Sequence, residues 1–217
     1  MDLDPRAPLF FVSYAHSSDG YKANGRPHEP NRQFVRFFDD LSENVAELVS
    51  RQAGSEPGYM DRSMHGGVYW TRELLGAIGT CQVFVAMLSA PYFVSPWCSK
   101  EWYAFSQRRV IRRSDDGSDN QTAIIPVIWA PLPHDRIPVI VNSVQRFSPG
   151  GLAKADVSAL YEENGVGGLL RTKQKAAYRA VVWQLAKRIA RVHYSHRVEA
   201  GPLDESELRD IFREQET

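Results

Sequence analysis

Residues 82–88, Gln-Val-Phe-Val-Ala-Met-Leu, constrain the fold more than any other stretch of the sequence. Side chains of a strand point alternately to the two faces of its sheet, and from Val83 onward both faces are apolar. Such a strand is typical of the centre of a parallel sheet that helices cover on both faces. The sequence therefore predicts a buried central strand within an α/β architecture.

Other short apolar stretches are predicted as the neighbours of this strand, and they are residues 8–14, 58–60 and 123–129. Pro126 lies inside the last of them. Because proline has no backbone N–H, that strand is expected at an edge of the sheet. A further short strand is expected near residues 144–147.

Helices are predicted between these strands from the spacing of apolar residues, over residues 34–49, 71–79, from Pro96 to about Arg113, and 172–196. The polar stretches between them, residues 15–31, 61–67 and 114–121, are expected as loops. Strands and helices alternate along the chain. We therefore expect a mainly parallel sheet with right-handed crossovers and helices on both faces.

The bulk composition is that of an ordinary globular protein, with 43% hydrophobic and 24% charged residues in 217. Zero net charge argues against a nucleic-acid-binding protein. No N-terminal signal segment and no apolar run of membrane-spanning length is present, so no membrane partner is expected and the cytoplasm is the expected location. Cys81 and Cys98 are too few for a disulfide framework, and His193 and His196 lack a third ligand, so no metal site is expected.

Glu101 is the residue that the predicted helices leave unexplained. Ser95 is a good N-cap and Pro96 fits the first helical position, which places Glu101 in the second turn. Its neighbours on the same helical face are all apolar: Trp97, Cys98, Ala104 and Phe105. A carboxylate in such a place either reaches water at the edge of the apolar stripe, or has a distant partner, a raised pKa or a cleft to face.

The predicted sheet favours the cleft. Ligands of open parallel sheets bind outside the carboxyl ends of the strands. The residues that follow those ends here are Ser13 and Tyr14, Asp61 with its loop, Ser89 and Trp129. Trp97 and Glu101 are expected above the same edge, so a binding site is predicted there.

Several segments, in this order and spacing, resemble the TIR (Toll/interleukin-1 receptor) domain. They are Phe10-Phe11-Val12-Ser13-Tyr14-Ala15, Tyr59-Met60-Asp61-Arg62 with the Gly66-Gly67 loop, Trp70, Leu74-Leu75-Gly76-Ala77-Ile78, the strand of residues 83–89, Ile125-Pro126-Val127 and, most specifically, residues 89–101, Ser-Ala-Pro-Tyr-Phe-Val-Ser-Pro-Trp-Cys-Ser-Lys-Glu. The similarity covers residues 9–150 and looks closest to the bacterial branch of the family.

The resemblance implies a flavodoxin-like, three-layer fold with a five-stranded, mainly parallel sheet. The domain is expected over residues 1–198, with a core of about 8–150 and a closing helix of about 172–196, followed by a polar C-terminal helix or tail over 199–217. The resemblance also implies one of two functions. Members of the family either cleave the nicotinamide–ribose bond of NAD or serve as non-catalytic modules for protein interaction and self-assembly.

The enzymatic members carry a catalytic Glu in a Trp-Cys-x-x-Glu pattern, which here assigns that role to Glu101. The chemistry is consistent with a single carboxylate, because nicotinamide leaves from a cationic pyridinium and needs no proton. The carboxylate would hold ribose hydroxyls and stabilise the positive charge that develops at the anomeric carbon. The expected products are nicotinamide with ADP-ribose or a cyclic form, in bacterial defence or signalling.

The remaining substrate-binding candidates each have a structural alternative. Trp97 would stack on nicotinamide or adenine or anchor the core, and Cys98 is either a lining residue or a buried thiol. Ser13 and Tyr14 would line the ribose side, although Tyr14 also fits plain packing. Asp61 would face the cleft or cap its loop. Arg62 would meet phosphates or remain solvated.

No phosphate-cradling glycine motif is present, so NAD is expected as a substrate and no cofactor is expected. Gly66 and Gly67 are expected to let their loop open and close over the site. Self-association is expected through the loop from Asp61 to Trp70, and the chain is expected to form a homo-oligomer.

Overall fold

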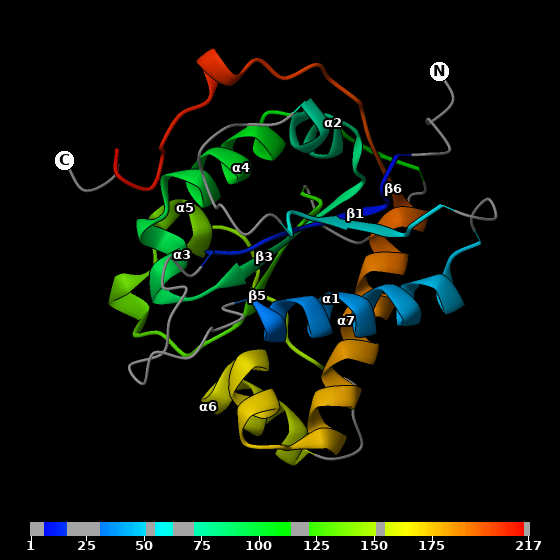
Figure 1. The fold of residues 1–217 in the computed structure, drawn as a ribbon, viewed down its shortest axis with the longest axis vertical. Coiled ribbons are helices and arrows are strands. Elements are labelled where there is room, and N and C mark those ends of the chain that lie inside the picture. Colours follow the sequence, from blue (N-terminus) through cyan, green and yellow to red (C-terminus); the bar gives the residue numbers. More distant parts are fainter. Residues whose placement is uncertain are drawn as a thin grey trace.

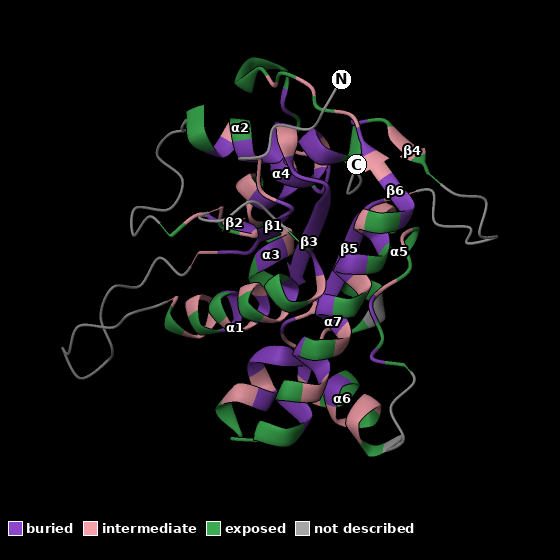
Figure 2. Ribbon diagram, turned by 90° about the vertical axis from the view of Figure 1, so that its right-hand side faces the viewer, coloured by how far each residue is buried: buried purple, intermediate pink, exposed green. Residues whose placement is uncertain are grey.

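A parallel sheet of four strands, in the order β2-β1-β3-β5, lies at the centre of the computed structural model (Figure 1). The strands are β1 (Phe10–Ser13), β2 (Gly58–Met60), β3 (Val83–Leu88) and β5 (Ile124–Ile128). The structure describes residues 7–16, 31–50, 55–62, 72–113, 122–150 and 155–214. Every residue of β3 is buried between β1 and β5, which confirms its predicted central position (Figure 2).

Pro126 occupies β5, the edge strand of the described sheet, as predicted, and Phe147 lies beside its outer edge. The backbone N–H of Phe147 donates a 2.8 Å hydrogen bond to the Pro126 carbonyl. Proline is tolerated there because its nitrogen is not needed in the ladder between β3 and β5. The short strand expected near residues 144–147 was wrong, because these residues form no regular strand, although this hydrogen bond joins Phe147 to β5.

Helices form a layer on each side of the sheet, as Figure 1 shows, with α1 and α7 on one face and α2 and α4 on the other. Their bounds are α1 (Arg32–Leu48), α2 (Arg72–Thr80), α4 (Pro96–Ser106) and α7 (Lys175–Ser195). The apolar stripe predicted for the closing helix is buried. The Tyr178 hydroxyl donates a 2.6 Å hydrogen bond to Asp40 Oδ2, which joins α7 to α1. The α/β class and the three layers are therefore confirmed.

The helix predicted to run from Pro96 to about Arg113 was wrong at its C-terminal end. Helix α4 stops at Ser106, and β4 (Val110–Arg112) pairs antiparallel with β6 (His196–Val198). The Arg108 guanidinium turns inward, where Nη1 donates to the carbonyls of Ile78 and Cys81 at 2.7 and 2.6 Å. A buried arginine that satisfies these carbonyls follows the end of the helix.

Helix α6 (Ala155–Arg171) was not predicted from the sequence. Gly165 interrupts it with a positive φ of 62° and lies against the Trp129 carbonyl, where any side chain would clash. The Gly167 N–H donates to the same carbonyl at 2.9 Å, so α6 is attached to the end of β5. The other short helices are α3 (Ala90–Val94), α5 (Val139–Asn142), η1 (His134–Arg136) and η2 (Glu205–Glu207).

The segment after β6 runs back over α2 and α4, as the orange and red trace in Figure 1 shows. Up to Glu214, where the described residues end, its regular structure is η2, and the polar helix or tail over residues 199–217 stays a prediction. Phe212 is buried at 2% exposure, and its N–H donates to the Ser99 hydroxyl at 2.9 Å. Its ring packs against Tyr92, Phe93 and Trp102 at centroid distances of 5.7 to 6.1 Å. This segment therefore covers the helix that carries Glu101.

Several predictions fall on residues outside the described ranges. They concern most of the 15–31 loop, the first residue of the helix predicted over 71–79, the 114–121 loop, and the 61–70 loop beyond Arg62 with its two glycines. Among the described helices, none has the length and apolar character needed to cross a bilayer. The described part of the chain also contains no group of three or more His, Cys, Asp or Glu arranged to hold a metal ion.

Candidate functional site

Glu101 lies in the second turn of α4, where the sequence predicts it. The Ser95 hydroxyl accepts the Cys98 N–H at 3.4 Å, and Pro96 occupies the first helical position. The helix is therefore capped as expected, and it turns Glu101 toward the sheet rather than toward water. The Glu101 side chain is buried, with 8% exposure.

A chain of hydroxyl groups holds this carboxyl group. The Ser13 hydroxyl, at the end of β1, donates to Glu101 Oε2 at 2.5 Å. The Tyr92 hydroxyl of α3 lies 3.0 Å from the same Ser13 oxygen. Because serine has one hydroxyl hydrogen, which Glu101 accepts, Tyr92 donates to Ser13. Three elements, β1, α3 and α4, thus converge on one carboxyl group.

Burial dominates the electrostatics of Glu101. It raises the pKa of the carboxyl group from 4.5 to about 8, against the Ser13 hydrogen bond, which lowers it, while the charge of Asp61 raises it further. Among the described residues no Lys or Arg forms an ion pair with Glu101, and the neighbouring Lys100 lies over the Trp97 ring at 5.6 Å. The carboxyl group is therefore mostly protonated at neutral pH.

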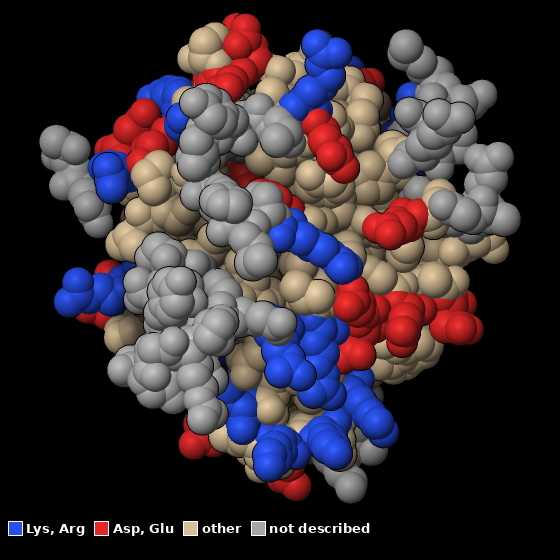
Figure 3. Space-filling model, viewed as in Figure 1, with Lys and Arg blue, Asp and Glu red and all other residues tan. Residues whose placement is uncertain are grey.

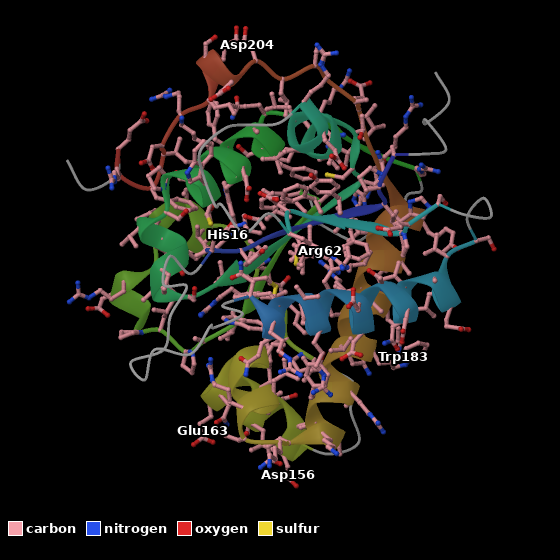
Figure 4. The ribbon with its side chains drawn as sticks, viewed as in Figure 1. His16, Arg62, Asp156, Glu163, Trp183 and Asp204 are labelled. Atoms are coloured by element: carbon pink, nitrogen blue, oxygen red, sulfur yellow. The ribbon has the colours of Figure 1, made fainter. Side chains whose placement is uncertain are left out.

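Tyr14, Asp61 and His16 form a second group beside Glu101. The Tyr14 hydroxyl donates to the Asp61 carbonyl at 2.7 Å, and its ring stacks on His16 at 4.4 Å. His16 Nε2 lies 3.8 Å from Asp61 Oδ2. Burial and then the charge of Asp61 raise the pKa of Tyr14, and burial lowers the pKa of His16. Figure 4 shows His16 beyond the carboxyl end of β1.

The other predicted site residues are Cys98, Trp97 and Arg62, and they differ in how they lie relative to Glu101. Cys98 is a free, buried thiol on the same face as Glu101, and burial raises its pKa well above the usual range, with a smaller contribution from the Glu101 charge. Trp97 is half-buried one turn before Glu101. Arg62 lies across the Phe38 ring and pairs with Asp39 at 2.6 Å. Arg62 is thus directed toward α1, and the other predicted residues lie around Glu101.

The strand order explains why the site forms at this position. From β1 the chain moves outward to β2 on one side, and then crosses to β3 on the other. A crevice forms at such a reversal, outside the carboxyl ends of the two adjacent strands. Ser13 ends β1, and α3 with Tyr92 follows β3, so the Glu101 cluster lies at the reversal. Fold and site together define a doubly wound α/β protein with its candidate site at the switch point.

Comparison with known families gives this class a name. Residues 38–167, about three fifths of the chain, match the TIR domain family model. The chain therefore belongs to the TIR domain family, as the sequence motifs predicted. The matched region runs from α1 into α6 and contains Glu101. A search of curated proteins found no match.

His16 and Tyr92 are the site residues that sequence reasoning missed. His16 lies three residues after the end of β1, so its polar character near a strand end was the available signal. Tyr92 gave no such signal, because nothing local distinguishes a tyrosine that donates to Ser13 from one that fills the core. Three cavities lined by described residues, with volumes of about 400, 450 and 520 Å³, share no lining residue with the Glu101 cluster.

Proposed function

We propose that this TIR domain cleaves the nicotinamide–ribose bond of NAD, with Glu101 as the catalytic carboxylate. The observation that carries the proposal is a buried carboxyl group that no described cation neutralises, located at the switch point of the sheet. Leaving a carboxylate in such surroundings destabilises a fold, and groups of this kind cluster at functional sites. A structural role would be met more stably by Gln or Leu at the same position.

The positive charge of NAD explains how a protonated resting group becomes active. The pyridinium ring favours the ionised form of a nearby carboxyl group, so binding of NAD lowers the pKa of Glu101. The Ser13 hydroxyl then holds one carboxylate oxygen, and the other is directed at a ribose hydroxyl. As the glycosidic bond breaks, its electron pair neutralises the pyridinium, and the carboxylate stabilises the charge on the ribosyl group.

The reaction ends when a nucleophile attacks the ribosyl cation. Addition of water gives ADP-ribose and releases a proton, whereas attack by the adenine of the same molecule gives a cyclic product. Trp97 lies one turn before Glu101 and offers its half-buried ring for stacking on a base. The proton balance requires no second carboxylate, because the leaving nicotinamide is neutral.

TIR domains commonly self-associate, and we propose that this chain acts as a homo-oligomer joined through the loop of residues 61–70. The alternative function is a non-catalytic interaction module. Only an enzyme needs the ionisable group of Glu101, whereas both functions need the assembly surface. An assay that varies the Glu101 side chain and the assembly state independently therefore distinguishes the enzyme from the interaction module.

The test follows nicotinamide release from NAD by liquid chromatography, with wild type and Glu101→Gln each at low concentration, at high concentration and with a crowding agent. Release by wild type in any of these states, together with loss in Glu101→Gln, supports the proposal. Background release by both proteins in every state contradicts it. Sedimentation of both proteins shows whether assembly is unchanged by the substitution.

A further inference from the structure

A basic cavity of about 450 Å³ lies between α7 and the segment that follows α5. None of the residues that line it belongs to the Glu101 cluster. Helix α7 lines it with Gln184, Lys187, Arg188 and Arg191. Their spacing of three and four residues places all four side chains on one helical face. Figure 2 shows α7 running along the sheet past β5, the strand that borders this cavity.

The wall opposite α7 adds a fourth cation and an apolar surface. Arg146 lines the cavity from the segment after α5. Ile124, Ile125 and Phe147 are buried residues of the same wall and form an apolar floor. Cations from two separate elements therefore converge over a surface that an uncharged ring system could cover.

The charge of this cavity is one-sided. The described residues that line it include four Lys or Arg residues and no Asp or Glu. By contrast, the cavity between α1 and α7 combines Arg36, Lys175 and Arg179 with Asp40 and Glu43. The face that carries α1 likewise shows acidic and basic side chains next to one another (Figure 3). In a chain of zero net charge, three cations on one face of α7, with no Asp or Glu among the described residues that line the cavity, are a local feature rather than a general one.

The cations on α7 also repel one another. Within the described part of the chain, the side chains of Lys187, Arg188 and Arg191 form no ion pair and no hydrogen bond. Burial, and then the charge of Arg191, lower the pKa of Arg188. Like charges at this helical spacing destabilise a helix. A bound anion would remove this repulsion.

The geometry points to a binding site for a nucleotide-sized phosphate ester, of the nucleoside diphosphate class, in this cavity. Guanidinium groups match phosphate oxygens with paired hydrogen bonds, and Arg188, Arg191 and Arg146 supply them. The apolar floor accepts the base, and the Gln184 amide offers polar contacts to it. The volume lies within the range of small-molecule pockets, which is about 300–1,000 Å³.

A nucleic-acid polymer fits this cavity less well than a nucleotide. A long polyanion gains affinity by contacting cations over an extended surface. Zero net charge and the mixed charges of the α1 face offer no such surface there. The proposed site shares no lining residue with the Glu101 cluster, so it stands independently of the proposed reaction.

The experiment is calorimetric titration of the full chain with ADP, inorganic pyrophosphate and adenosine, each at low and high salt. Wild type is expected to bind ADP most tightly, pyrophosphate less tightly and adenosine undetectably, with affinity for ADP falling as salt rises. Arg188→Gln/Arg191→Gln removes two charged donors and is expected to weaken ADP binding at least about tenfold. The matched control Arg72→Gln/Arg171→Gln removes two exposed arginines from α2 and α6 and is expected to leave ADP binding unchanged.

A second pair of variants separates charge from geometry. Arg188→Lys/Arg191→Lys keeps the charge and loses the paired donors, so it is expected to bind ADP more weakly than wild type and more tightly than the Gln pair. If circular dichroism shows that the Gln pair does not fold, ADP binding by the Lys pair tests the proposal instead. Equal ADP binding by wild type and both variants overturns the proposal. Tighter binding of a single-stranded oligonucleotide than of ADP, lost in the same variants, overturns it in favour of a polymer site.

Discussion

Replacing Glu101 with Gln is expected to change how the stability of the fold depends on pH. The folded carboxyl group has a pKa of about 8, raised from 4.5 chiefly by burial. Between these two values the folded protein keeps a proton that the unfolded chain has released. The free energy of unfolding of the wild type therefore falls as pH rises, by about 1.4 kcal/mol per pH unit.

Across the whole interval this loss amounts to about 5 kcal/mol, and it ends above pH 8, where both states are ionised. The Gln side chain is nearly isosteric, accepts the Ser13 hydroxyl and does not titrate. Glu101→Gln is consequently expected to be more stable than wild type at pH 8, by an amount that shrinks toward pH 5. The difference between the two proteins isolates Glu101 from all other titrating groups.

The assay is urea unfolding of both proteins at intervals from pH 5 to pH 9. Glu163→Gln is the matched control, because Glu163 is exposed on α6 and Figure 4 shows it at the surface, in water in both states. Its difference from wild type is expected to stay nearly constant with pH. A constant difference for Glu101→Gln over the same range would refute the assigned burial and raised pKa.

Three further predictions concern the contacts around this group. Ser13→Ala removes the hydrogen bond that lowers the pKa of Glu101. The pH profile of kcat/KM for nicotinamide release is therefore expected to shift to higher pH by about 1 pH unit, and an unshifted profile would count against the bond. Phe212→Ala is expected to destabilise the fold by about 3–5 kcal/mol in urea titrations, because a fully packed ring is lost above Ser99; a cost below about 1 kcal/mol would contradict that packing. Arg108→Met leaves carbonyl groups of two segments without their donor and is expected to cost about 2–4 kcal/mol, measured the same way with the exposed Arg109→Met as control; equal stability of the two variants would contradict this role.

The sheet and the Glu101 helix could be predicted because their signals are local. An apolar run on both faces defines β3, a proline places β5 at an edge, and a Ser-Pro pair begins α4. The apolar neighbours of Glu101 already indicated an unusual carboxyl group. These patterns depend on residues within one element, and the sequence displays them directly.

The missed elements depend on contacts between distant segments. Strand β4 exists because Val110 and its neighbours pair with β6, almost ninety residues later in the chain. Arg108, which follows α4, donates to the carbonyls of Ile78 in α2 and of Cys81 just after it, and nothing local in the sequence shows these contacts. Helix α6 carries a glycine with positive φ that a local pattern treats as a helix breaker.

The candidate site likewise has residues that the local sequence predicts and residues that only the packing of distant segments reveals. Ser13 was predicted from its place at a strand end, and the structure adds that its hydroxyl reaches Glu101. Arg62 was considered for phosphate binding, and the structure shows it paired with Asp39. Tyr92 and His16 were absent from the prediction because their roles follow from the packing of α3 and β1. At the candidate site, the sequence did not convey the direction of these side chains.

The central claim is that one ionisable group, Glu101, cleaves NAD. The most direct measurement is the rate of nicotinamide release from NAD at pH 6, 7, 8 and 9, by wild type and Glu101→Gln under self-associating conditions. The kcat/KM of wild type is expected to rise with pH and to level near pH 8, while the variant is expected to stay at background throughout. Equal release by the two proteins at every pH would contradict it.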